Sequence, residues 1–130
     1  MADVLVDTSV WINFFRHAKG RSGDELRALL QADRVLLCGV VEMEIYQGLS
    51  ESELHNIQAI FEAIPYIETS REDFIASGTL WSSQRKQGKI VPSTDCLIAE
   101  LCIRHDLTLF SLDSHFEEIN GLKRMTWLPS

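Results

Sequence analysis

Several residue types that define whole classes of protein are scarce in this sequence. Its three cysteines, Cys38, Cys96 and Cys102, show neither paired spacing nor an even count, so we expect reduced thiols rather than disulfides or a zinc site. Seven glycines and three prolines among 130 residues are too few for a collagen-like or linker-rich chain. The longest apolar run, residues 35–41, is too short to span a membrane, and no signal peptide is visible at the start. We therefore expect a cytoplasmic protein without a membrane contact.

Positive charge is also in short supply. The chain has 12 lysines and arginines against 19 aspartates and glutamates, which gives a formal net charge of −7. Such a chain is poorly suited to coating nucleic acid electrostatically. A site built from several carboxylates would itself supply much of the excess, however, and a bound metal ion would reverse the local sign of charge. The composition therefore weakens a nucleic-acid hypothesis without removing it.

What the sequence does contain is a regular alternation of short apolar runs and longer amphipathic segments. A length of 130 residues with 45% hydrophobic and 24% charged residues fits one globular domain spanning residues 1–130. Strands are expected at 4–6, 35–38 and 107–110, with weaker ones near residue 67 and over 125–127. Helices are expected at 10–15, 24–31, 40–48, 51–63, 71–87 and 95–105. This order predicts an α/β fold with a parallel sheet covered by helices on both faces.

Two segments give further expectations, one about packing and one about a loop. The helix over 71–87 carries Phe74, Ile75, Leu80 and Trp81, which we expect to face the core. The segment 16–23 after the first helix is polar and contains glycine, so we expect a loop there.

The segment Val4-Leu5-Val6-Asp7-Thr8-Ser9-Val10-Trp11-Ile12 carries the first chemical signal. Its β-branched start predicts a buried strand, and its apolar residues resume at helical spacing after Asp7-Thr8-Ser9. A carboxylate is thereby placed at the carboxyl end of a strand, where open α/β sheets bind their ligands. The alternative is that Asp7 only caps the following helix.

Three further acids stand out by position. Asp113 follows the strand 107–110, Asp95 lies in the first turn of a helix, and Glu44 lies in a short helix that is otherwise mostly apolar. If they converge with Asp7, the four carboxylates form a set of oxygen ligands suited to Mg²⁺ or Mn²⁺ rather than zinc.

Each acid also has an ordinary structural interpretation. Asp95 would then be a plain acid at a helix N-terminus, Asp113 a turn residue beside a capping Ser114, and Glu44 a solvated residue like Glu42. Acids supplied to one edge by several separate elements are harder to explain in this way, so the metal site is the preferred hypothesis.

Four segments in order resemble the PIN domain, and the near-complete coverage of a short chain resembles VapC toxins. They are Leu5-Val6-Asp7-Thr8-Ser9-Val10-Trp11-Ile12, Glu44-Ile45-Tyr46-Gln47-Gly48, Asp95-Cys96-Leu97-Ile98-Ala99 and Leu109-Phe110-Ser111-Leu112-Asp113 with Phe116. VapC toxins are the ribonuclease halves of bacterial and archaeal type II toxin–antitoxin pairs. The resemblance implies a PIN-like three-layer α/β/α sandwich and a Mg²⁺- or Mn²⁺-dependent endoribonuclease.

The resemblance also assigns residues. Asp7, Glu44, Asp95 and Asp113 correspond to the acidic metal-binding quartet of the family, and Thr8 or Ser9 and Ser111 to hydroxyls that line its site. His115 is a departure, because relatives often carry another acid before the phenylalanine.

The chemistry of phosphodiester cleavage fits this set of acids. One or two divalent ions polarise the phosphoryl oxygens and lower the pKa of an attacking water. We expect Asp7 and Asp95 to be the principal ligands, Glu44 a ligand or a base that orients water, and Asp113 to complete the shell.

An RNA substrate (tRNA, rRNA or mRNA) also needs positive charge near the acids. The candidates are Arg16, Lys19 and Arg21 after the first helix, with His17 beside them, and Arg85, Lys86 and Lys89 near the end of the long helix. Surface residues of this kind are more often simply solvated.

Partners are implied by the resemblance as well. A VapB-type antitoxin usually lays a helix into an apolar groove near the active site, and toxin chains commonly form homodimers and toxin–antitoxin hetero-oligomers. The aromatic first helix, with Val10, Trp11, Phe14 and Phe15, fits either such a groove or the core.

Three rival functions differ in the residues that they need. A phosphoacceptor receiver domain needs paired acids after the first strand and a lysine after a late strand, and both are missing here. A haloacid-dehalogenase-type phosphatase needs an aspartate two residues after Asp7, where Ser9 stands. A catalytically inactive PIN-fold binding module remains as the main alternative, although all four acids are present.

Overall fold

The alternation of strands and helices is present as expected. A computed structural model of the chain describes residues 3–17 and 20–125. In chain order the elements are β1 (Val4–Val6), α1 (Thr8–Arg16), α2 (Arg21–Gln31), β2 (Val35–Cys38), α3 (Gly39–Gly48), α4 (Glu51–Glu62), β3 (Tyr66–Ile67), α5 (Arg71–Lys86), α6 (Ser93–Arg104), β4 (Thr108–Phe110), the 3₁₀ helix η1 (Ser114–Phe116) and β5 (Lys123–Arg124). The α/β class is confirmed.

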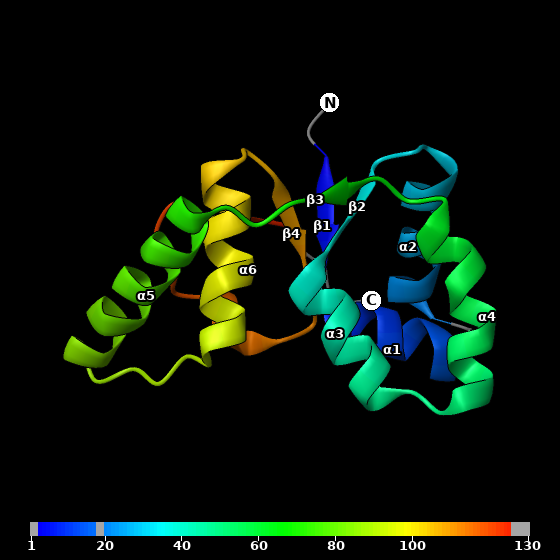
Figure 1. Cartoon of the computed structure of the whole chain (residues 1–130), viewed down its shortest axis with the longest axis horizontal. Helices are drawn as coiled ribbons and strands as arrows, with labels where there is room; N and C mark the ends of the chain where they lie inside the picture. The colour runs from blue at the N-terminus through cyan, green and yellow to red at the C-terminus, as the bar shows by residue number, and fades with distance from the viewer. Residues whose placement is uncertain (1–2, 18–19, 126–130) are drawn as a thin grey trace.

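The sheet has the strand order β3-β2-β1-β4-β5, and each described pair of neighbouring strands is parallel. From β1 the chain moves outward to β2 and β3, and it then returns across the sheet to β4 and β5. Because such crossovers are right-handed, the reversal of direction moves the connecting helices to the opposite face. Figure 1 shows α5 and α6 on one side of the strands and α1, α2 and α4 on the other. The three-layer sandwich is confirmed.

The core is centred on β1 and the start of α1. All three residues of β1 are buried, and Trp11 is fully buried with its ring 5.2 Å from that of Phe61 on α4. Val10 is buried as well, whereas Phe14 and Phe15 are only partly buried. Val10 and Trp11 therefore belong to the core. Burial of each such side chain contributes about 1.5–3 kcal/mol to the free energy of folding.

Two boundaries differ from the sequence prediction. Helix α2 begins at Arg21, so residues 21–23 are helical rather than part of the loop, and the hydrogen bond from Asn13 Nδ2 to Ser22 Oγ (2.6 Å) ties this turn to α1. The last strand is Lys123–Arg124 and pairs with β4, rather than the expected 125–127. Residues 126 and 127 lie outside the described part of the chain. None of the described helices combines the length and the apolar composition needed to cross a membrane.

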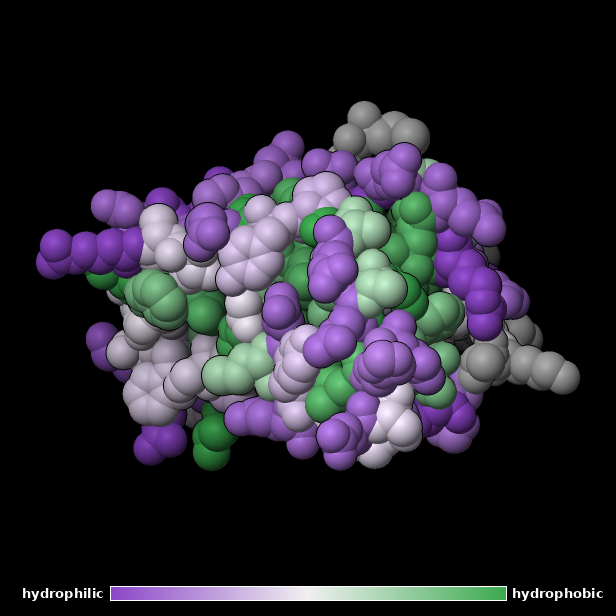
Figure 2. Space-filling model, turned by 45° about the vertical axis from the view of Figure 1, so that its right-hand side comes forward, coloured by the Kyte–Doolittle hydropathy of each residue, from purple (hydrophilic) through white to green (hydrophobic). Residues whose placement is uncertain are grey.

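The orientation predicted for α5 is wrong. Phe74, Ile75 and Trp81 are 57%, 59% and 37% exposed, and only Leu80 of the expected set packs against the core. The buried residues of α5 are the polar Asp73, Ser77 and Gln84. Figure 2 shows from another side that hydrophobic residues reach the surface in patches between hydrophilic ones.

An ion-pair cluster explains this orientation. The buried Asp73 carboxylate accepts hydrogen bonds from the Ser70 backbone N–H (2.9 Å) and from Arg104 Nε (2.8 Å), and it lies 3.1 Å from His105 Nε2. Arg104 ends α6 and His105 follows it, so the carboxylate links the start of α5 to the end of α6. An unpaired buried carboxylate would be costly, and this pairing fixes which face of α5 points inward.

We expect Asp73→Ala to lower the free energy of unfolding by about 1–3 kcal/mol, because it removes a helix cap and leaves Arg104 without its buried partner. Burial acts to raise the pKa of the Asp73 carboxyl, but the hydrogen bonds from Ser70, Arg104 and His105 outweigh it and lower the pKa from 3.8 to about 2.

The stabilisation by Asp73 is therefore complete above its unfolded-state pKa and is lost as the pH falls towards 2. Urea unfolding of the two proteins at about pH 7 and about pH 3 measures this difference. A destabilisation by Asp73→Ala that is the same at both pH values would contradict the assignment.

Candidate active site

The centre of the sheet contains a topological switch point. Strands β1 and β4 are neighbours, but β1 leads to β2 on one side whereas β4 leads to β5 on the other. Ligands of open α/β sheets bind outside the carboxyl ends of the strands at such a point. Asp7 directly follows β1 and donates its backbone N–H to the Phe110 carbonyl oxygen (2.9 Å), while Ser111 and Asp113 follow β4. The two strand ends thus place three polar side chains at one edge.

Asp7 is held by hydroxyl groups and not by the helix that it precedes. It occupies the N-cap position of α1, but its side chain makes no capping hydrogen bond. Instead, its buried Oδ2 accepts hydrogen bonds from Ser9 Oγ (2.8 Å) and Ser111 Oγ (2.7 Å). The interpretation of Asp7 as a simple capping carboxylate is therefore wrong.

The hydroxyls expected at the site lie against its acids. Thr8 Oγ1 donates a hydrogen bond to Glu44 Oε1 (2.9 Å), which joins the first turn of α1 to the middle of α3. Ser9 Oγ also accepts the Leu112 backbone N–H (3.1 Å), so the segment after β4 is fixed against α1. These bonds orient two carboxylates without neutralising their charge.

Asp95 and Asp113 meet at a histidine. His115 Nδ1 lies 2.8 Å from Asp95 Oδ2 and 3.1 Å from Asp113 Oδ1. Within residues 3–17 and 20–125, these three side chains form the one group whose possible metal-ligating atoms all lie within 4.8 Å of one another. Asp113 also caps η1, because its Oδ1 accepts the His115 backbone N–H (2.9 Å).

His115 is a site residue that the sequence prediction missed, because it was noted only as a departure from the family pattern. The signal that could have found it is its position two residues after the predicted ligand Asp113. Its bond to Asp95 depends on a contact between η1 and α6, which no local pattern encodes.

Two of the carboxyl groups, those of Glu44 and Asp95, have raised pKa values, with burial as the largest cause. Burial raises the pKa of Glu44, and the charges of Asp7 and Asp95 add to it, outweighing the hydrogen bond from Thr8. Burial likewise raises the pKa of Asp95, helped by the charges of Asp7 and Asp113 and opposed by the bond to His115. Asp7 and Glu44 do not belong to the group of closest ligand atoms, but their charges act on it. The structure thus brings all four predicted acids into one electrostatically coupled cluster.

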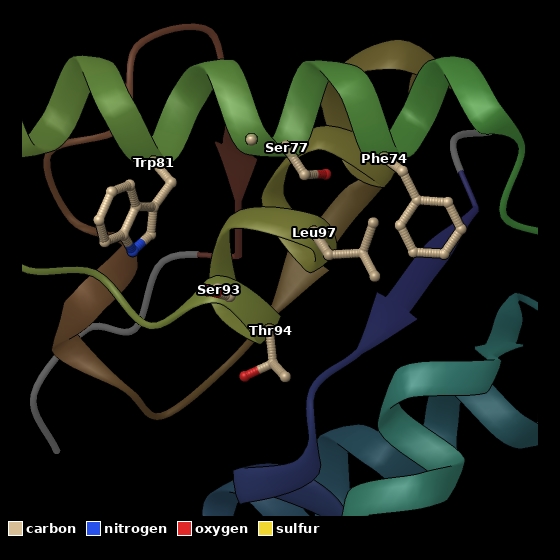
Figure 3. A pocket seen from close by; sticks show the side chains of 7 residues that line it. Phe74, Ser77, Trp81, Ser93, Thr94 and Leu97 are labelled. Carbon is tan, nitrogen blue, oxygen red and sulfur yellow. The ribbon is translucent and has the colours of Figure 1, made fainter.

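A groove between α5 and α6 adjoins this cluster. It has a volume of about 520 Å³, and Figure 3 shows side chains of both helices pointing into it. Its lining includes Phe74, Ser77 and Trp81 from α5 and Ser93, Thr94 and Leu97 from α6. Thr94 precedes Asp95 in the chain, so this largely apolar groove opens next to the acids.

The basic residues expected to contact RNA lie in two separate places. Arg16 donates a hydrogen bond from Nη2 to the Gly48 carbonyl oxygen (2.7 Å), and its Nε lies 3.6 Å from Glu53. The Arg85 guanidinium lies over the Trp81 ring, 5.3 Å from its centroid, at the groove between α5 and α6. Arg21 begins α2 and Lys86 ends α5. Lys89 Nζ lies 2.9 Å from Glu118 Oε2. Lys19 lies outside the described residues.

Comparison with known proteins defines the class to which this fold and site belong. Residues 4–122 match the family model of the PIN domain, so the chain belongs to the PIN-domain family. It is 32% identical over 121 residues to Ribonuclease VapC11 of Mycobacterium tuberculosis (strain ATCC 25618 / H37Rv), which covers 89% of this chain and 90% of that protein. The same figures hold for VapC ribonuclease Mb1587 of Mycobacterium bovis.

Solved structures confirm the fold. DNA-bound VapBC from Salmonella typhimurium has a chain with a TM-score of 0.82 and 18% identity, covering 96% of this chain and 98% of that one. FitAcB from Neisseria gonorrhoeae has a TM-score of 0.77 and 21% identity, with 95% and 96% coverage.

Asp95 and Asp73 can be compared directly, because both are buried aspartates in the first turn of a helix. Substituting each in turn distinguishes an acid kept for function from one that stabilises the fold. Folding raises the pKa of Asp95 and lowers that of Asp73, so ionised Asp95 opposes folding whereas ionised Asp73 favours it. We expect Asp73→Asn to lower the midpoint of thermal unfolding in metal-free buffer and Asp95→Asn to leave it unchanged or raise it. Equal losses in both variants would make Asp95 a structural acid.

Proposed function

We propose that this chain is a Mg²⁺- or Mn²⁺-dependent endoribonuclease that acts in the cytoplasm as the toxin of a type II toxin–antitoxin pair. The observation that carries the proposal is the convergence of four carboxylates, two of them buried, at the switch point of a PIN-domain sheet. Buried like charges of this kind are costly unless a cation neutralises them. The ribonuclease names of the VapC relatives support the choice of RNA as substrate.

The donor set fits a hard divalent cation. The carboxylate oxygens that suit Mg²⁺ or Mn²⁺ come from Asp7, Glu44, Asp95 and Asp113. The three cysteines, whose sulfur would suit softer metals, are buried as free thiols. Asp7 and Asp95 are assigned as the principal ligands, with Asp113 completing the shell. One or two ions bound there supply polarisation of the phosphoryl oxygens and a lower pKa of the attacking water.

The remaining groups position these acids. Ser9 and Ser111 both donate to Oδ2 of Asp7 and so fix the plane of its carboxylate. Thr8 holds one oxygen of Glu44, which is therefore oriented to bind the ion or to accept a proton from the attacking water. Site residues anchored by such bonds need little reorganisation during the reaction.

RNA (tRNA, rRNA or mRNA) would reach the acids past basic residues. Arg85 and Lys86 lie on the last turn of α5, beside the groove that adjoins Asp95, and they are the preferred contacts. Arg16, Lys19 and Arg21 form a second candidate region, although Arg16 already bonds Gly48. Phosphate contacts of this kind give affinity rather than sequence specificity.

Protein partners follow from the relatives. The solved neighbours include DNA-bound VapBC, a member of the VapBC family of toxin–antitoxin systems and a toxin–antitoxin complex from Klebsiella pneumoniae, which supports a VapB-type antitoxin and hetero-oligomers for this chain. A homodimer is proposed through the exposed face of α5, where Phe74 and Ile75 are each more than half exposed. Exposed apolar residues clustered on one helix are typical of a protein interface.

We expect Asp7→Asn and Asp95→Asn each to lower the rate of RNA cleavage by about a hundredfold or more, because each removes a charge that holds the ion. The assay is cleavage of total cellular RNA by antitoxin-free protein with Mg²⁺ or Mn²⁺. Chelator should abolish cleavage, and the matched control Asp106→Asn, at an exposed aspartate paired with Lys123, should retain it.

Cleavage that survives the chelator would refute the metal dependence. A folded protein that binds Mn²⁺ but cuts no RNA would favour the catalytically inactive PIN-fold binding module.

The proposed homodimer is tested by Phe74→Glu, which places a charge on the exposed face of α5. We expect this variant to sediment as a monomer while the wild-type chain sediments as a dimer, because a buried unpaired charge opposes association. Ile90→Glu, at a residue that is 76% exposed in the segment after α5, is the matched control and should stay dimeric. Dimers that persist in Phe74→Glu would assign the interface to another surface.

A further inference from the structure

One of the atoms that could bind a metal ion in the acidic cluster is a nitrogen. His115 Nδ1 is held between Asp95 Oδ2 on α6 and Asp113 Oδ1 at the start of η1. Its side chain is 45% exposed, so it stands at the mouth of the cluster rather than in the core.

We propose that His115 Nδ1 is itself a ligand of the metal ion, together with Asp95 and Asp113, and that it makes this site prefer Mn²⁺ over Mg²⁺. The inference rests on the proposed function, because it concerns the same metal. Beyond the proposed function, it names His115 as a nitrogen ligand and Mn²⁺ as the ion that this ligand selects.

The spacing of the three side chains fits shared coordination. Neighbouring ligands of an octahedral ion bound at about 2.1 Å lie about 3 Å apart. The distances from His115 Nδ1 to the two carboxylate oxygens, 2.8 Å and 3.1 Å, agree with that spacing. Because the Asp113 carboxylate also accepts the His115 backbone N–H, the two side chains on η1 are held in a fixed relation to each other.

Ligand chemistry then determines the choice of ion. Mg²⁺ dehydrates reluctantly and is bound almost entirely through oxygen. An imidazole nitrogen favours first-row transition ions, and combined carboxylate and histidine ligation is known from proteins with manganese sites. A carboxylate at position 115 would make the set all oxygen and would lose this discrimination.

The alternative is that His115 only donates a hydrogen bond to Asp95 and orients it. The two roles differ in one observable, because a coordinated nitrogen couples magnetically to Mn²⁺ whereas a hydrogen-bond donor outside the coordination shell does not. Pulsed electron paramagnetic resonance of the Mn²⁺-loaded chain therefore separates them without any activity measurement.

We expect the wild-type chain with Mn²⁺ to show the ¹⁴N modulation of a directly bound imidazole and His115→Asp to bind Mn²⁺ without it. The ratio of the Mg²⁺ dissociation constant to the Mn²⁺ dissociation constant should fall by at least about tenfold in His115→Asp. Removing even an outer-shell partner of a metal ligand lowers metal affinity by about tenfold or more, so losing a direct ligand should have an effect of at least this size. His55→Asp, the same substitution at an exposed histidine on α4, is the matched control and should keep both properties.

Mn²⁺ bound by the wild-type chain without ¹⁴N modulation would overturn this inference, and so would a ratio unchanged in His115→Asp. Either result leaves the proposed function intact if cleavage still needs a divalent ion. Absence of Mn²⁺ binding together with metal-independent cleavage would instead overturn both proposals.

Discussion

The repulsion among the carboxylates that gather outside the carboxyl ends of β1 and β4, from the strand ends and from α6, is the constraint on which the rest of the site depends. Asp7 and Asp95 are only 4% and 8% exposed, yet neither is paired with a lysine or arginine in the described hydrogen bonds and ion pairs. Hydroxyl groups hold the Asp7 carboxylate in place, and His115 holds that of Asp95 and opposes the rise in its pKa without preventing it. The pKa values of Asp95 and of the neighbouring Glu44 are raised as a result of burial and nearby charges, and perturbed carboxylates of this kind are typical of functional sites.

The fold contains a contrasting acid that shows what structural pairing looks like. Asp73 is buried beside Arg104 and His105 at the end of α6, and its charge favours folding. The same helix carries Asp95 in its first turn. One end of α6 is therefore anchored to α5 by an ion pair with arginine. This anchorage positions the helix whose other end brings Asp95, bonded only to a histidine in the described contacts, to the site.

Strand positions, the α/β class and the acids at the strand ends could be predicted from sequence because each depends on local patterns. The face of α5 could not, because Asp73 is buried only through partners on α6, far along the chain. Apolar spacing alone put Phe74 and Trp81 inside, whereas tertiary ion pairing overrides that pattern. The placement of His115 beside Asp95 depends in the same way on a contact between distant segments.

Net charge is a weak guide to the partners of such a chain. The value of −7 includes the four clustered carboxylates, part of whose charge a divalent ion would neutralise if it were bound there. The positive charge that matters for a polyanion is local, and Arg85 and Lys86 stand on the last turn of the helix that lines the groove next to Asp95. An acidic protein can therefore bind a phosphodiester at one edge of its sheet while the rest of its surface repels it.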